Sequence, residues 1–188
     1  MNIRQKIRQA LLEGKQKKTT HKNEYGCLMV YLNADKDKWE EMQNLIDDED
    51  LYQPEDDPTY GRENEPHVTI LYGFHGDIKD SDINKEINKI KKPELTFGDV
   101  SAFTNEKFDV LKFDVDSKDM HKLNDKFKEF PHTNNYPDYH PHCTIAYLKP
   151  KMAEKYIKKL KKFLDIELEP SHLVYSKVDG SKNEYKFD

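Results

Sequence analysis

One seven-residue phrase occurs twice in this chain, as PHVTILY at residues 66–72 and as PHCTIAY at residues 141–147. The two copies share proline, histidine, threonine, isoleucine and tyrosine at the same places. Chance placement of the histidines and threonines gives fewer than one His-x-Thr pair in a chain of this length, so one pair alone carries no information. Two pairs with the same neighbours indicate an internal duplication.

Each phrase has the composition of a half-buried β-strand. In a strand, successive side chains point to opposite faces, so His67 and Thr69 share one face, as do His142 and Thr144. The residues between them are apolar and predict a buried face behind. If the two strands meet around a pseudo-twofold axis, two imidazoles and two hydroxyls converge on one cleft.

The segments around the two phrases predict an α+β fold. Each phrase is followed by a helical segment and then by two strand-like segments, which suggests two similar halves. Strands are predicted at 25–33, 66–72, 94–103, 107–115, 141–147, 165–178 and 183–188. Helices are predicted at 3–13, 35–47, 80–92, 117–130 and 151–164.

Charge is distributed unevenly along the chain. Residues 1–22 carry seven Lys or Arg and one Glu, and predict a basic helical extension with a linker. Residues 23–188 then form a single domain, which suits a chain of 188 residues. Residues 47–65 carry nine Asp or Glu and one Arg. Prolines and a glycine within 48–65 predict a long exposed loop that serves as a mobile surface or lid.

Composition excludes several classes of protein. The two cysteines, Cys27 and Cys143, are too few for a disulfide framework or a thiolate zinc cage. The first residues lack the apolar core of a signal peptide, and no run of 18 apolar residues could span a membrane. We therefore expect a soluble protein in the cytoplasm.

Two histidines that face each other suit phosphodiester chemistry without a metal. A neutral imidazole can take a proton from the attacking hydroxyl, and a protonated imidazole can give one to the departing oxygen. Threonine hydroxyls can hold the non-bridging oxygens, where charge builds up in the transition state. The sequence therefore predicts neither a metal nor a cofactor.

PHVTILY and PHCTIAY resemble the paired His-x-Thr/Ser signatures of the 2H phosphoesterase superfamily. This superfamily includes bacterial RNA 2′,3′-cyclic phosphodiesterases, viral 2′-5′ oligoadenylate phosphodiesterases and phage anti-CBASS nucleases. The resemblance covers the layout of residues 24–188. It implies a bilobal fold, with two pseudo-symmetric antiparallel sheets and flanking helices around a central cleft. It also implies metal-independent cleavage, with His67, Thr69, His142 and Thr144 as the catalytic residues.

The tyrosines of the two motifs bear on the substrate. The bacterial RNA enzymes commonly carry arginine at the position of Tyr147, whereas tyrosine in both motifs is similar to the phage anti-CBASS branch. The resemblance implies a phosphodiester in which a ribose 2′-oxygen takes part. The candidates are a cyclic oligonucleotide second messenger, a 2′,3′-cyclic phosphate or a 2′-5′ linkage. A phage-encoded enzyme of this kind would act in the host cytoplasm to evade immunity.

Three further residues are candidates for substrate binding. Tyr72 and Tyr147 can stack on a base or bond a phosphate, although strict alternation turns them away from the histidines unless a bulge intervenes. His140 shares a face with His142 and either lines the cleft or lies on the loop surface. His140 and His142 also resemble a metal pair, but no further ligand sits at a recognisable spacing.

Two other classes of function remain open from the sequence. A nucleotide- or RNA-binding module could keep the cleft without turnover, and an adaptor could act through the basic residues 1–22. The expected partner is a small nucleotide, a cyclic oligonucleotide or an RNA end. Neither a membrane nor an obligatory protein partner is expected.

Overall fold

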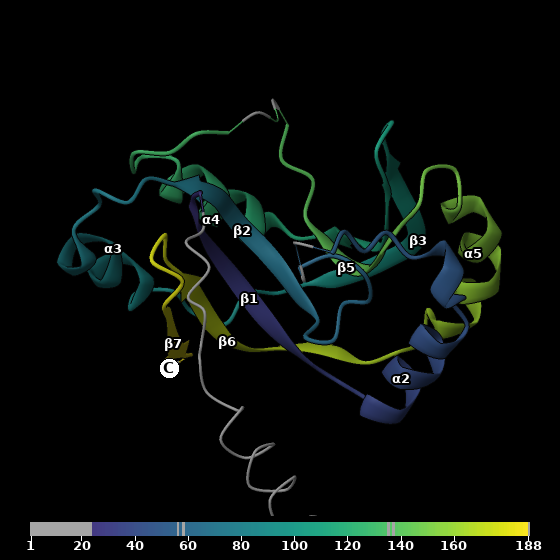
Figure 1. Ribbon diagram of the computed structural model, residues 1–188. Coiled ribbons are helices and arrows are strands. Elements are labelled where there is room, and N and C mark those ends of the chain that lie inside the picture. The colour runs from purple at the N-terminus through teal and green to yellow at the C-terminus, as the bar shows by residue number, and fades with distance from the viewer. Residues whose placement is uncertain (1–23, 56, 58, 135, 137, 188) are drawn as a thin grey trace, which may run out of the picture.

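The computed structural model describes residues 24–55, 57, 59–134, 136 and 138–187, so the predicted basic extension at 1–22 lies outside the described residues. Within them, seven strands form one antiparallel sheet in the order β3-β4-β5-β2-β1-β6-β7 (Figure 1). The strands are β1 (Gly26–Ala34), β2 (His67–Phe74), β3 (Thr96–Thr104), β4 (Asp109–Asp116), β5 (His142–Leu148), β6 (Leu168–Ser176) and β7 (Lys182–Lys186). The helices are α2 (Lys36–Asn44), α3 (Asp80–Ile87), α4 (Lys118–Phe127) and α5 (Ala153–Leu160), with short 3₁₀ turns η1 (Asp48–Asp50) and η2 (Lys161–Phe163).

The α+β class is confirmed, but one sheet replaces the two that were expected. The repeated phrases form β2 and β5, which are neighbours at the centre of the sheet. Val68 pairs with Cys143, and this one register pair joins the two halves. The two halves therefore share a seam of backbone pairing where the sequence predicted an open cleft between separate sheets.

The duplication is visible in the connectivity. The chain runs β1-α2-β2-α3-β3 and then β4-α4-β5-α5-β6, with β7 added at the edge. The third strand of each set crosses to the other half, so that β3 lies beside β4 and β6 lies beside β1. If each strand of the first set is exchanged for its counterpart in the second (β1 for β4, β2 for β5 and β3 for β6), the order β3-β4-β5-β2-β1-β6 is recovered, read from the opposite edge.

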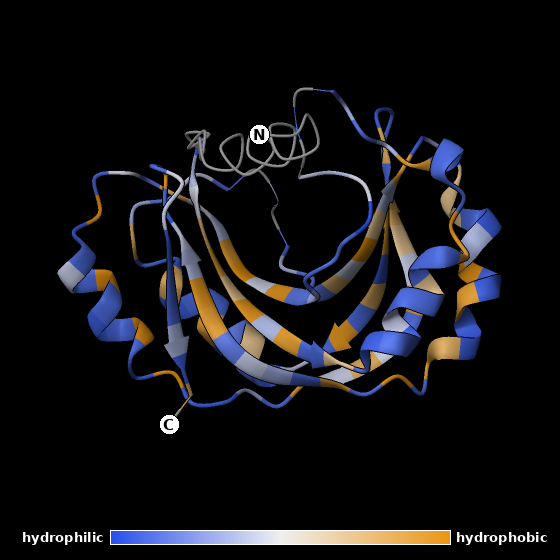
Figure 2. Ribbon diagram, turned by 60° about the horizontal axis from the view of Figure 1, so that its bottom comes forward, coloured by the Kyte–Doolittle hydropathy of each residue, from blue (hydrophilic) through white to orange (hydrophobic). Residues whose placement is uncertain are grey.

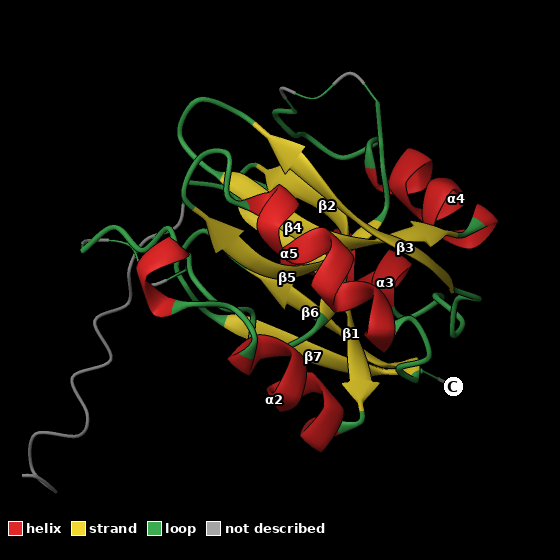
Figure 3. Ribbon diagram, turned by 90° about the vertical axis from the view of Figure 1, so that its right-hand side faces the viewer, coloured by secondary structure: helices red, strands yellow, loops and turns green. Residues whose placement is uncertain are grey.

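The sheet is bent into a trough, with the helices along its outer side (Figure 2). Viewed from one end, α5 lies in front of the strands (Figure 3). Strand residues that face these helices are apolar and buried. They include Leu28, Val30, Val68, Ile70, Leu111, Phe113, Cys143 and Ile145. The other face of the trough is left to polar and aromatic side chains. Among the described residues, no helix is long and apolar enough to cross a membrane.

The acidic segment is more firmly attached than the sequence suggested. Leu51 is buried and pairs with Leu148, and Arg62 pairs with Ala146. The Arg62 guanidinium donates to the Gln43 carbonyl at 3.1 Å and also contacts the carboxylate that begins η1. The single arginine thus ties the two ends of the acidic segment to α2 and the turn that follows it.

The segment that leads into each motif strand is hydrogen-bonded to the backbone of the other motif strand. The Glu63 amide donates to the Ile145 carbonyl at 3.0 Å, and the Thr133 amide donates to the Gly73 carbonyl at 2.9 Å. Gly73 has φ of 112°, and a Cβ there would lie 2.0 Å from the Thr133 carbonyl oxygen. Only glycine fits this approach, since both the backbone angle and the space exclude a side chain.

Candidate active site

The two His-x-Thr pairs lie side by side on the inner face of the trough. Their strands overlap only at the N-terminal ends, because the pair Val68–Cys143 is the second position of each. Antiparallel pairing then places His67 next to Thr144 and Thr69 next to His142. The two histidines are diagonal neighbours, about 7–8 Å apart for such positions.

Both imidazole rings are fixed in the same way. The Nδ1 atom of His67 lies 2.9 Å from the Glu65 carbonyl oxygen, and that of His142 lies 2.8 Å from the His140 carbonyl oxygen. A carbonyl oxygen can only accept, so each Nδ1 carries the proton of the bond. In the neutral ring, Nε2 therefore keeps its lone pair and is turned away from the backbone.

The surroundings of the two rings differ. A Glu63 carboxylate oxygen lies 3.7 Å from His67 Nδ1, and the Tyr31 ring stacks on His67 with centroids 5.5 Å apart. The ring of His142 instead meets the edge of Phe103, with centroids 5.0 Å apart. Burial raises the pKa of Glu63 above its ordinary value, and the charge of His67 acts in the opposite direction.

Burial and nearby charges together lower the pKa of His142. Burial lowers the pKa of His142 below its ordinary value, while the contact with the His140 carbonyl acts in the opposite direction. The charges of Lys112 and His67 add to the lowering, and Asp114 opposes it. The neutral form of His142 is thereby favoured, which is the form that can accept a proton.

Lys112 was not singled out by the sequence, yet it lies opposite Thr144 on β4 with only 4% of its surface exposed. Its ammonium group donates to the Ser101 hydroxyl at 2.7 Å and to the Asp114 carboxylate. It also lies 4.2 Å from the centroid of the Phe103 ring. A buried cation is thus held on the inner face of the trough, beside one motif strand. The sequence feature that could have indicated this buried cation is a lysine placed between Leu111 and Phe113 in the predicted strand at 107–115.

A bulge interrupts each motif strand at the same place. On β2, Ile70 has no partner between Thr69, opposite Met29, and Leu71, opposite Leu28. On β5, the register shifts in the same way around Ile145. A bulge adds one residue to a strand and re-aims the side chains that follow it.

The bulges turn the two motif tyrosines to the histidine face, against strict alternation. Tyr72 lies opposite Cys27, which shares a face of β1 with Met29, the partner of Thr69. On β5, the Thr144 side chain contacts the Tyr147 phenol. Both tyrosines therefore stand on the same side of the sheet as the His-x-Thr pairs.

Buried amides hold the carbonyls that the bulges leave outside the ladder. Asn124 of α4 donates to the Ile70 carbonyl at 2.8 Å, and Gln43 of α2 donates to the Ile145 carbonyl at 2.8 Å. Both amides are almost fully buried. Each motif strand is thus supported by the helix that precedes the other motif.

The two tyrosines differ in their packing. Tyr147 belongs to a cluster with Tyr60, whose centroid is 4.9 Å away, and Phe108, at 5.7 Å. Burial raises the pKa of Tyr147 to about 12, with the Thr144 contact acting the other way. Tyr72 is 52% exposed and meets only the edge of Tyr25, at 5.9 Å, among the described rings.

The third candidate, His140, is exposed beside the cleft. Its ring lies 6.4 Å from the Phe103 centroid, and its carbonyl fixes the His142 ring. Sequence reasoning also missed Tyr139, whose hydroxyl donates to the Thr69 carbonyl at 2.7 Å. Over the part of the chain that the structure describes, no group of three or more His, Cys, Asp or Glu side chains could hold a metal ion.

Comparison with known proteins identifies relatives of this arrangement. Residues 31–182 match the family model of the 2′-5′ RNA ligase superfamily. No curated protein sequence matches the chain.

Two solved structures share the fold, and a third has a lower similarity. Usb1 from Kluyveromyces marxianus has a TM-score of 0.55 at 11% identity, covering 88% of this chain and 99% of that one. The same protein with uridine monophosphate gives 0.55 at 12% identity, with the same coverage. A crystal structure of a phosphoesterase gives 0.44 at 11% identity, covering 86% of this chain and 95% of that one.

Proposed function

The chain belongs to the 2′-5′ RNA ligase superfamily of 2H phosphoesterases, and on that premise we propose that it is a metal-independent phosphodiesterase. Its substrate is a ribonucleotide in which a 2′-oxygen takes part in the scissile phosphodiester. One observation supports this proposal above the others: two His-x-Thr pairs share one face of the sheet, and both rings have Nδ1 bound to a carbonyl.

His142 is the general base in this proposal. Its pKa is lowered by burial, so the ring stays neutral at neutral pH and its Nε2 lone pair can take the proton of the attacking hydroxyl or water. The attacking oxygen then forms a bond to phosphorus as its proton moves to His142. General acid–base help of this kind is worth about 10²–10⁴-fold in rate.

His67 is the general acid. Its protonated ring keeps the Nδ1 bond to the Glu65 carbonyl and donates from Nε2 to the departing oxygen, while the bond from that oxygen to phosphorus breaks. The Glu63 carboxylate at 3.7 Å compensates the positive charge of that ring. The hydroxyls of Thr69 and Thr144 donate to the non-bridging oxygens as their charge grows. Proton exchange with water restores both rings.

A small ribonucleotide substrate suits the charge around the two rings. Carboxylates of Glu63, Glu65 and Asp114 surround the two histidines and would repel a long polyanion. A nucleotide is also the ligand of a solved structure that shares the fold, Usb1 with uridine monophosphate. The paired tyrosines favour a cyclic oligonucleotide of the kind that an immune-evasion enzyme would destroy.

The test is a panel incubation of the full chain, run in parallel without EDTA, with EDTA, and with EDTA followed by excess divalent cation. The substrates are 2′,3′-cyclic nucleotides, 2′-5′ oligoadenylate, and 2′- and 3′-linked cyclic dinucleotides and trinucleotides, with products read by mass spectrometry. His67→Ala and His142→Ala are each expected to lower the rate by at least about 10²-fold, because each removes one proton-transfer group. His121→Gln, at an exposed position on α4, serves as the matched control and should keep wild-type rates.

Full activity in either alanine variant would exclude the two-histidine mechanism. Loss of activity with EDTA that returns with a divalent cation would exclude the metal-independent reaction. A non-catalytic binding module predicts instead that a cyclic dinucleotide binds to the wild-type chain and is recovered intact after long incubation.

A further inference from the structure

A row of three rings crosses three neighbouring strands and ends at the proposed acid. Tyr31 on β1 pairs in register with His67 on β2 and with His172 on β6. Ring centroids are 5.5 Å apart between Tyr31 and His67, and 5.2 Å apart between Tyr31 and His172. The proposed reaction uses only one member of this row. The other two continue along the inner face, away from the second motif.

A cavity of about 290 Å³ adjoins this row. Small-molecule sites in proteins start at about 300 Å³, so the cavity suits a ligand fragment of modest size. Tyr31 and His172 provide flat walls, and Val174 is buried beneath them. Its other lining residues are Glu65, Lys182 and Glu184. A planar ligand that stacks on aromatic rings is the shape that these walls accept.

The structure also fixes the proton on His172. The Ser171 hydroxyl donates to the Tyr31 carbonyl at 3.0 Å, so its oxygen is left to accept from His172 Nδ1 at 2.8 Å. In the neutral ring, Nε2 is then an acceptor, as in His67 and His142. A third ring of the inner face is therefore held in the same tautomer.

Acceptors outnumber donors on the lining of the cavity. Glu65 and Glu184 contribute two carboxylates, against the one ammonium group of Lys182, which lies 3.9 Å from Glu65. The Tyr31 hydroxyl donates to Glu65 at 3.4 Å and is largely committed to that bond. The net negative charge disfavours a phosphate in this cavity, whereas a neutral ring with several N–H groups would satisfy the carboxylates.

We propose that this cavity is a guanine subsite, which binds one base of the substrate while its ribose and phosphate extend toward His67. This inference rests on the proposed phosphodiesterase function. Guanine presents two adjacent donors, N1–H and the 2-amino group, which match the two oxygens of one carboxylate. Its O6 atom can accept from Lys182. Adenine places the unprotonated N1 where guanine has a donor, and uracil has a single ring N–H between two carbonyls, so each leaves a carboxylate unpaired.

The experiment measures binding of GMP, AMP, CMP and UMP to the wild-type chain by isothermal titration calorimetry. None of these monophosphates contains a phosphodiester bond, so binding is read without turnover. GMP is expected to bind at least about 10-fold more tightly than the other three, since hydrogen bonds to charged groups are worth about that factor or more. Because the two adjacent donors of guanine match a single carboxylate, one of the two variants Glu65→Gln and Glu184→Gln should weaken GMP binding by a similar factor. Glu129→Gln, an exposed carboxylate on the far side beside α4, is the matched control.

Equal affinity for GMP and any of the other three would overturn the guanine assignment. GMP affinity that is unchanged in both glutamine variants would overturn it as well. The two proposals fail separately. A guanine preference together with no cleavage of any diester in the panel supports the subsite and excludes the enzyme. Cleavage without a base preference excludes only the subsite.

Discussion

Burial of His142, to which the charge of Lys112 adds, makes the two histidines of the site unequal. Both rings are tethered identically at Nδ1, so their hydrogen bonds cannot decide which one is base and which is acid. The difference lies in the neighbours, since a buried ammonium group acts on His142 and a carboxylate faces His67. At the scale of single residues, the role of each histidine therefore follows from side chains outside the repeated phrase.

Replacement of Lys112 should shift the acidic limb of the profile of kcat/KM against pH. In Lys112→Met, the positive charge that lowers the pKa of His142 is lost, while Asp114, which raises it, remains. The pKa of His142 is then higher, so His142 becomes protonated, and loses its role as base, at a higher pH than in the wild type. The profile of kcat/KM against pH should therefore show its acidic limb shifted upward.

Lys107→Met, an exposed lysine at the turn of the same hairpin, is the control and should keep the wild-type profile. A uniform loss of rate without any shift of the acidic limb would show that Lys112 acts on packing alone and does not control the charge of His142.

The repeated phrase was enough to predict the residues that meet at the seam, but not the residues that surround them. His67, Thr69, His142 and Thr144 share one face, because alternation in a strand is a local property. Tyr31 and Lys112 reach the same face only through the pairing of β1 with β2 and of β4 with β5. That register depends on contacts distant in sequence, which a single sequence does not display.

Bulges and their amide partners are the functional feature at the scale of elements. Tyr72 and Tyr147 could not face the histidines in regular strands, and the extra residue in each strand corrects their direction. Asn124 supplies a side-chain donor to the buried Ile70 carbonyl, and Gln43 adds a second donor to the Ile145 carbonyl, which also accepts from the Glu63 amide. Asn124 and Gln43, on the buried faces of two amphipathic helices, were thus sequence features that could have indicated these contacts but that hydrophobic periodicity does not reveal.

Removal of either amide should reduce both stability and activity. Asn124→Leu removes the side-chain donor of the Ile70 carbonyl, and Gln43→Met removes one of the two donors of the Ile145 carbonyl, so the free energy of unfolding should fall by about 1–3 kcal/mol. The catalytic rate should fall as well, because the threonine and tyrosine beside the bulge lose their alignment. Urea denaturation and the panel assay measure the two effects on the same preparations.

Asn44→Leu, at an exposed position next to Gln43, controls for the change of residue type. The kinetic profile against pH should keep its shape in both amide variants, since neither residue touches a histidine. Stability that is lost without any change in rate would mean that the bulges carry no catalytic alignment.

Element boundaries could be predicted closely where hydrophobic periodicity was strong. The predicted helix at 117–130 is α4 (Lys118–Phe127), and the Met120 amide caps its start by donating to Ser117 Oγ at 3.1 Å. The acidic segment over 48–65 was harder, because its attachment depends on the Arg62 guanidinium, which bonds the carbonyls of Gln43 and Ile46 outside the segment as well as Asp48 within it. Composition indicates where a loop lies but not what holds it.

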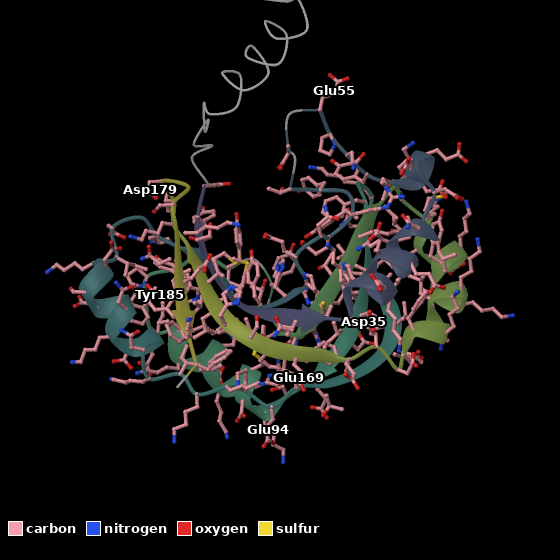
Figure 4. All side chains as sticks on the ribbon, turned by 90° about the horizontal axis from the view of Figure 1, so that it is seen from below. Asp35, Glu55, Glu94, Glu169, Asp179 and Tyr185 are labelled. Carbon is pink, nitrogen blue, oxygen red and sulfur yellow. The ribbon has the colours of Figure 1, made fainter. Side chains whose placement is uncertain are left out.

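The molecule as a whole is two halves that exchange strands. Each trough wall has its outer tip in a polar loop, with Glu55 on one side and Asp179 on the other (Figure 4). Between them, β3 and β6 each cross from one motif's half to the other, so neither half is a continuous piece of chain. The sequence predicted two lobes because it shows the repeat, while the crossing appears only in the pairing of the strands. The halves should therefore unfold together.

This coupling can be tested with one core substitution far from the fluorescent reporter. Phe74, at the end of β2, is fully buried and meets Phe127 and Tyr175 edge to face, so Phe74→Leu should cost about 1–3 kcal/mol. The single tryptophan, Trp39, lies on α2, which supports β5 of the second set through the bond from Gln43 to the Ile145 carbonyl. The Trp39 ring nitrogen donates to the Glu63 carbonyl at 2.9 Å. Because crossing strands join the halves, the urea midpoint from Trp39 fluorescence should fall by as much as the midpoint from far-ultraviolet circular dichroism.

Leu164→Ala, at an exposed position, should move neither midpoint. A Trp39 midpoint that stays at the wild-type value while the dichroism midpoint falls would show that the halves unfold independently, since the strain introduced at Phe74 would then stop at the seam between β2 and β5.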